Sequence, residues 1–177
     1  MLKQLFALAI CFGSVGWAAS KPDFSGNYAQ LNKGDSSSSA SIRVVETDAA
    51  VEVTRVYGAK SITNKFPLDG SQGDYVTEAG VHGTCRAKLK NDVLVLEYLV
   101  ASRPYANEPA LRFDTTEEWR LSSDTRTLTI KTEIKCPDMP ANITAAAFPN
   151  NPRKEKFQRL DSRLCPLSCE SHRLHSF

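Results

Sequence analysis

The chain has 177 residues, of which 41% are hydrophobic and 24% are charged. This length suits one domain with its own core, and the composition excludes wholesale disorder and a membrane-spanning bundle. The 22 basic and 20 acidic side chains leave a formal net charge of +2, which argues against the basic surface of a nucleic-acid-binding protein. We therefore expect a single globular domain that does not bind nucleic acid.

Residues 1–20 have the parts of a secretory signal peptide. A positive start that includes Lys3 is followed by an apolar run over residues 5–15 and then by small residues. Cleavage after Ala18 and cleavage after Ser20 both fit this pattern. A membrane anchor is the alternative, but the run is well short of the roughly 20 apolar residues that a spanning helix needs. We expect a secreted or periplasmic mature protein with no stable membrane span.

The rest of the chain, residues 21–160, reads as a series of short alternating segments separated by turn residues. Short connectors such as Thr47-Asp48 and Lys90-Asn91-Asp92 predict neighbouring antiparallel strands. The expected strands cover residues 23–31, 40–47, 50–57, 61–66, 81–89, 93–102, 112–122 and 125–135, with a closing strand near 155–160. The pattern predicts an all-β domain.

The later strands carry the clearest signals. Residues 125–135 alternate apolar and polar side chains, so one face is expected in the core and the other in water. Residues 93–100 are apolar on both faces except at Glu97, which predicts the most buried strand, although a short buried helix gives a similar run. Residues 137–152 contain four prolines and predict an excursion that holds one helical turn.

Three segments carry a resemblance to a known family. They are Asp23-Phe24-Ser25-Gly26-Asn27-Tyr28, Leu94-Val95-Leu96-Glu97, and the run Glu118-Trp119-Arg120-Leu121-Ser122-Ser123-Asp124-Thr125-Arg126-Thr127-Leu128-Thr129. Over roughly residues 23–160 the chain resembles secreted bacterial lipocalin-like domains of unknown function. That family typically has Trp where this chain has Tyr28, and a turn Gly where it has Thr125. The resemblance implies a single antiparallel meander barrel of about eight or nine strands.

The resemblance also implies how one end of the barrel is closed. Lipocalins and their relatives cover an aromatic residue of the first strand with a basic side chain of the last strand. In this chain the corresponding residues are Tyr28 and Arg159. The alternative is that Tyr28 is an ordinary core aromatic.

Four cysteines follow the leader: Cys85, Cys136, Cys165 and Cys169. Export favours disulfides, and four thiols allow three pairings that sequence alone does not distinguish. The side chains of Cys85 and Cys136 are both expected to point inward, which favours pairing Cys85 with Cys136 and Cys165 with Cys169. A bond from Cys165 to either inner cysteine is the alternative, and it would fix the tail to the barrel.

The C-terminal tail, residues 161–177, also contains possible metal ligands, namely Cys165, Cys169, His172 and His175. On one helix these residues would spread over about 15 Å, far more than the ~2 to 2.3 Å bonds around a zinc ion allow. A folded-back loop would be needed to gather them. We therefore expect no metal and no other cofactor.

The candidate ligand-binding residues are Tyr98, Phe113 and Trp119 on the apolar faces of two strands, together with Glu97. An outward carboxylate paired with Lys or Arg is the more ordinary interpretation of Glu97. The sequence contains no nucleophile-elbow, phosphate-loop or zinc-protease motif, so no enzyme is expected. Two hypotheses follow: a barrel that binds a small apolar or amphiphilic ligand, and a non-catalytic interaction or protective protein with a filled barrel.

Overall fold

The computed structural model describes residues 21–31, 41–103, 109–149 and 151–160. These residues form ten strands and one helix: β1 (Gly26–Gln30), β2 (Ser41–Glu46), β3 (Ala50–Tyr57), β4 (Lys60–Pro67), β5 (Gly73–Val76), β6 (His82–Lys90), β7 (Val93–Ser102), β8 (Leu111–Leu121), β9 (Thr127–Lys135), α1 (Ala141–Ala147) and β10 (Arg153–Arg159). Within the described ranges, no helix has both the length and the apolar character needed to span a bilayer.

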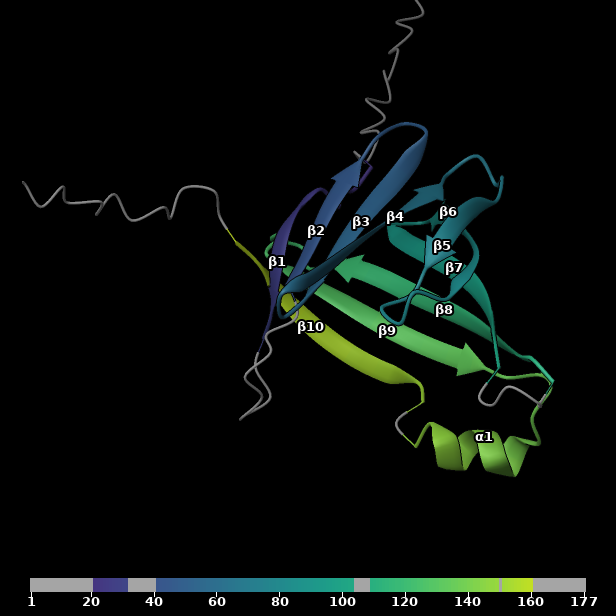
Figure 1. Cartoon of the computed structure of the whole chain (residues 1–177). Coiled ribbons are helices and arrows are strands. Elements are labelled where there is room, and N and C mark those ends of the chain that lie inside the picture. The colour runs from purple at the N-terminus through teal and green to yellow at the C-terminus, as the bar shows by residue number, and fades with distance from the viewer. Residues whose placement is uncertain (1–20, 32–40, 104–108, 150, 161–177) are drawn as a thin grey trace, which may run out of the picture.

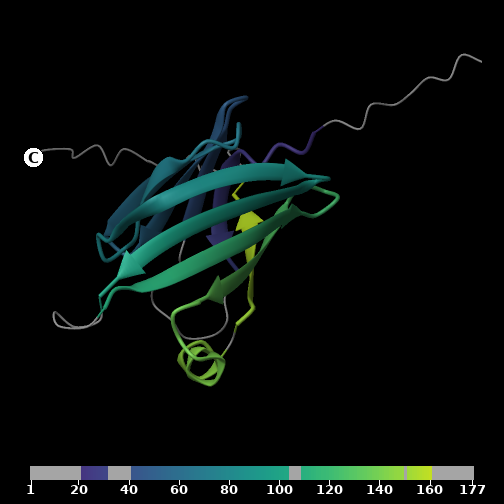
Figure 2. The ribbon, with the colours of Figure 1, turned by 90° about the vertical axis from the view of Figure 1, so that its right-hand side faces the viewer.

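All ten strands belong to one antiparallel sheet in the order β4-β3-β2-β1-β10-β9-β8-β7-β6-β5. The first and last strands are hydrogen-bonded neighbours, with Tyr28 opposite Arg159. The sheet curls into a nearly closed barrel, with β1–β4 facing β7–β9 across the core (Figures 1 and 2). The predicted all-β meander barrel is therefore confirmed.

The structure has one strand more than the highest number predicted. The additional strand is β5, which is only four residues long and contains Gly73. So short a segment shows little alternation, and its pairing with β6 places it in the sheet. The excursion after β9 also differs from the prediction, because α1 has seven residues, or about two turns, instead of one.

The barrel is completed where β4 and β5, the two edge strands of the sheet, meet. The side-chain amide of Asn64 on β4 donates to the carbonyl of Val76 at 3.0 Å and accepts from the Val76 N–H at 2.7 Å. Asn64 thus supplies the two hydrogen bonds that a strand neighbour would make. Cys85 on β6 adds contacts from its thiol to the carbonyls of Lys65 and Asp74, one on each side of this junction.

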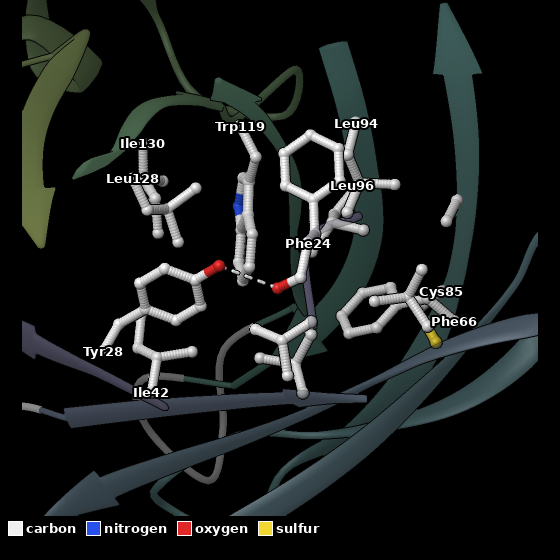
Figure 3. Close-up of a cluster of buried hydrophobic side chains, with 14 of the residues drawn as sticks. Phe24, Tyr28, Ile42, Phe66, Cys85, Leu94, Leu96, Trp119, Leu128 and Ile130 are labelled. Carbon is white, nitrogen blue, oxygen red and sulfur yellow. Dashed lines mark hydrogen bonds between the residues drawn. The ribbon is translucent and has the colours of Figure 1, made fainter. Parts of the chain in front are cut away.

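The apolar core fills one end of the barrel, which we call the Tyr28 end, and continues toward the β4/β5 junction at Tyr75 and Cys85. Tyr28 and Trp119 are completely buried there, and the Tyr28 hydroxyl donates to the Phe24 carbonyl at 2.9 Å (Figure 3). The surrounding buried side chains are contributed by strands from all around the barrel and include Ile42, Val44, Phe66, Leu94, Leu96, Leu128, Ile130 and Phe157. This core is the principal source of stability, because fully burying one such side chain contributes roughly 1.5–3 kcal/mol.

The helix α1 lies beyond the opposite end, which we call the α1 end, where β9 stops and β10 begins (Figures 1 and 2). Its returning segment is attached to β9 by Asn151, whose side chain donates to the Ile134 carbonyl at 2.6 Å and accepts from the Ile134 N–H at 2.9 Å. The Phe148 ring also packs edge-on against Phe113 of β8, with centroids 6.2 Å apart. These contacts hold the α1 segment against the barrel wall.

Candidate ligand-binding site

Successive inward-facing residues of β8 mark a change in the barrel interior from apolar to polar. Trp119 lies opposite Leu94 of β7 and Ile130 of β9, within the apolar core. Two residues nearer the α1 end, Glu117 lies opposite Leu96 and Thr132. Directly opposite residues share one face of an antiparallel sheet, so Thr132 and Glu117 are neighbours inside the barrel.

Glu117 is the centre of a hydrogen-bond network that is buried, since the Glu117 side chain is only 2% exposed. One carboxylate oxygen accepts from Arg55 Nη2 at 2.6 Å and from the Trp119 indole N–H at 2.9 Å. The other accepts from the Tyr98 hydroxyl at 2.8 Å. We call Arg55, Tyr98, Glu117 and Thr132 the polar layer. It crosses the barrel, because Arg55 comes from β3, on the wall opposite β8.

The polar layer keeps both of its charges. Burial acts to raise the pKa of Glu117, but Arg55 and the hydrogen bonds from Trp119 and Tyr98 outweigh it and hold that pKa below its ordinary value. Burial acts to lower the pKa of Arg55, and the Glu117 carboxylate outweighs this effect and raises it. The result is an ion pair within the barrel, in which the Glu117 carboxylate is shielded from water.

Two tyrosines extend this network toward the β4/β5 junction. The rings of Tyr75 and Tyr98 stack with centroids 4.4 Å apart, and Phe66 meets the Tyr98 ring edge-on at 6.4 Å. Burial raises the pKa of Tyr75 to about 12 and that of Tyr98 well above its ordinary value. Both phenols are therefore neutral hydrogen-bonding groups at neutral pH.

A cavity of about 190 Å³ lies beside the polar layer at the α1 end. Its lining combines inner-face residues of β9 and β10 with the α1 segment: Thr132, Ile134, Ala147, Phe148, Pro149, Asn151 and Arg153. Thr132 is 4% exposed, and its hydroxyl has no hydrogen-bond partner among the described residues. The cavity thus joins an apolar wall at Ile134 and Phe148 to a polar residue next to Glu117.

The structure brings three of the four predicted ligand-binding residues to the barrel interior. Trp119 and Tyr98 both hydrogen-bond Glu117, and Phe113 lies at the α1 end against Phe148. Glu97 is not in the interior, so its prediction as a ligand-binding residue is wrong, and its more ordinary interpretation as an outward, paired carboxylate is confirmed. It accepts from Arg86 Nε at 2.6 Å and from the Lys88 ammonium on the outer face, because side chains alternate in direction along β7.

Tyr28 and Arg159 are brought together at the other end of the barrel. The Arg159 guanidinium lies over the Tyr28 ring, 5.4 Å from its centroid, and donates to the carbonyls of Asp23 and Ser25. Gly26 leaves space for this arrangement, because a Cβ there would lie 2.8 Å from Arg159 Nε.

The predicted disulfide between Cys85 and Cys136 is wrong. Both residues are buried, as expected, but they are not bonded to each other. The strand order explains this, since β7 and β8 separate β6, which carries Cys85, from β9, which ends just before Cys136. Cys165 and Cys169 lie outside the described residues, as does the possible metal-ligand set of the tail. The described residues contain no group of three potential metal ligands.

Sequence reasoning missed the two charged members of the polar layer. Arg55 shares the inward parity of Val51 and Val53, and Glu117 shares that of Trp119. At both positions a charged residue lies on the strand face whose other residues are apolar, and this was the signal available in the sequence. The pairing itself joins residues 62 positions apart, so it depends on how the barrel closes.

The fold is similar to that of solved fatty-acid-binding barrels. A structure described as the REP1-NXSQ fatty acid transporter has a TM-score of 0.51 and 9% identity, covering 77% of this chain and 96% of its own. The Echinococcus granulosus fatty-acid-binding protein 1 has a TM-score of 0.51 and 11% identity, covering 77% and 97%. No protein-family model and no curated protein matches the sequence. The shared feature is therefore the lipocalin-like barrel fold.

Proposed function

We propose that this barrel binds a small amphiphilic molecule at its α1 end. The observation that carries the proposal is the 190 Å³ cavity, whose lining passes from Ile134 and Phe148 to Thr132 of the polar layer. Binding sites for small molecules commonly combine an apolar lining with a few polar groups that fix orientation. The apolar part of the ligand would contact Ile134 and Phe148, and its head group would face the polar layer.

The size of the cavity indicates the size of the ligand. A cavity of roughly 150 Å³ lined by apolar side chains accommodates benzene, so this one suits a substituted ring or a short alkyl chain. The similarity in fold to proteins described as a fatty acid transporter and a fatty-acid-binding protein supports an apolar ligand class. The proposed role is non-catalytic binding in a secreted or periplasmic protein, which follows from the leader-like residues 1–20.

Trp119 provides the test. It is the only tryptophan after the leader, and its indole N–H hydrogen-bonds Glu117. Titration of the mature protein with octan-1-ol, octanoate and longer-chain homologues should change Trp119 emission saturably, and calorimetry should give matching affinities. An absence of saturable change up to high micromolar concentrations for every ligand would reject the proposal.

A pair of α1 substitutions locates the site. Ala147 lines the cavity and is exposed, so Ala147→Phe should fill the space and weaken binding by about tenfold or more without removing core contacts. Ala146→Phe, one residue earlier and outside the described cavity lining, is the matched control and should bind like the wild type. Equal binding by both variants would place the ligand elsewhere.

A further inference from the structure

We infer that the preferred ligand carries a neutral hydrogen-bonding head group, such as an alcohol, rather than a carboxylate. This inference rests on the proposed function, since it concerns the head group of the ligand at the same site. The observation behind it is that the interior cation of the polar layer, Arg55, already has its counter-ion in Glu117 at 2.6 Å.

The ion pair leaves little opportunity for a second carboxylate. Both oxygens of Glu117 accept hydrogen bonds, and Tyr98 and Trp119 add two donors to that of Arg55. A ligand carboxylate could draw Arg55 away and leave Glu117 buried without its counter-ion, or it could lie beside Glu117 without one itself. Both arrangements place an uncompensated negative charge in a region shielded from water.

The second cation near the cavity is also paired. Arg153 lines the cavity, and its Nη2 lies 3.2 Å from Glu155 Oε2. The other oxygen of Glu155 accepts from the Gln30 side-chain amide at 3.1 Å. The charges of Arg55, Glu117, Arg153 and Glu155 therefore sum to zero without a ligand.

A neutral head group meets none of these costs. A ligand hydroxyl can exchange a hydrogen bond with the Thr132 hydroxyl, which lines the cavity and has no partner among the residues described. This interaction leaves the Arg55–Glu117 pair intact.

Matched ligands of one chain length test the inference. At pH 7 the wild type should bind octan-1-ol about tenfold more tightly than octanoate, measured by calorimetry and Trp119 emission. Glu117→Gln frees Arg55 from its counter-ion and should shift this ratio by about tenfold or more toward octanoate. Glu118→Gln is the matched control, because Glu118 lies on the outer face of β8 and is 38% exposed, and it should keep the wild-type ratio.

The outcomes separate this inference from the proposed function. Tighter binding of octanoate than of octan-1-ol by the wild type would overturn the inference and leave the binding function standing. Binding of neither ligand, nor of any homologue, would reject the binding function itself. If Glu117→Gln does not fold, a pH series on the wild type replaces it. Octanoate affinity should then rise toward that of octan-1-ol as acid neutralises the ligand, and a constant or falling affinity would overturn the inference.

Discussion

The two ends of the barrel are built on different principles. At the Tyr28 end, Phe24, Tyr28 and Trp119 are completely buried in a continuous apolar core, and Arg159 covers the Tyr28 ring. At the α1 end, the interior holds an ion pair, a cavity, and a threonine hydroxyl that has no hydrogen-bond partner among the described residues. The first arrangement supplies stability through apolar burial. The second retains polar groups that apolar packing would have excluded, and the proposed binding site is built on these groups.

The largest expected effect comes from breaking the ion pair at the α1 end. Arg55→Met leaves Glu117 buried without its counter-ion and should lower the free energy of unfolding by about 3 kcal/mol. The double variant Arg55→Met/Glu117→Gln removes the stranded charge and should recover about 2 kcal/mol of that loss. Urea unfolding of both variants measures this difference. A loss below about 1 kcal/mol for the single variant would show that water reaches the carboxylate.

Acidification should produce a smaller effect at the same end. The folded-state pKa of Glu117 is held below its ordinary value of 4.5. Its ionised form therefore stabilises the fold above that value, and this contribution is lost as the pH falls through the folded-state pKa. The free energy of unfolding, measured from pH 6 to pH 3, should fall less steeply in Glu117→Gln than in the wild type. Glu118→Gln controls for the loss of one carboxylate, and equal slopes in the two variants would contradict the assignment.

The smallest expected effect lies in the turn between β8 and β9, at the Tyr28 end. Thr125 adopts a positive φ of 57°, which is unfavourable for a β-branched residue. Thr125→Gly should raise the free energy of unfolding by about 1 kcal/mol, after the greater flexibility of glycine in the unfolded chain is counted. Thr125→Ala keeps a Cβ and should gain less in the same thermal or urea unfolding measurement. A gain for alanine equal to that for glycine would assign the effect to something other than φ.

Local patterns in the sequence predicted most of the strands and the inward direction of several side chains. The expected 50–57 and 93–102 strands coincide with β3 and β7, and parity placed Trp119 on the apolar face. These features depend only on the alternation of side-chain direction along a single strand. The network at Glu117 depends instead on which strands face one another across the barrel. The same limit explains the wrong cysteine pairing, since parity gives direction but not the distance between strands.

Asn64 has a consequence for how this protein behaves in a crowded solution. An incompletely paired sheet edge offers backbone groups to strands of other molecules, which is a route to aggregation. Here the Asn64 amide occupies both backbone groups of Val76, so β5 is already matched to β4 within the same molecule. One side chain thus takes the place that an intruding strand would occupy, and it protects β5 where the backbone ladder itself is incomplete.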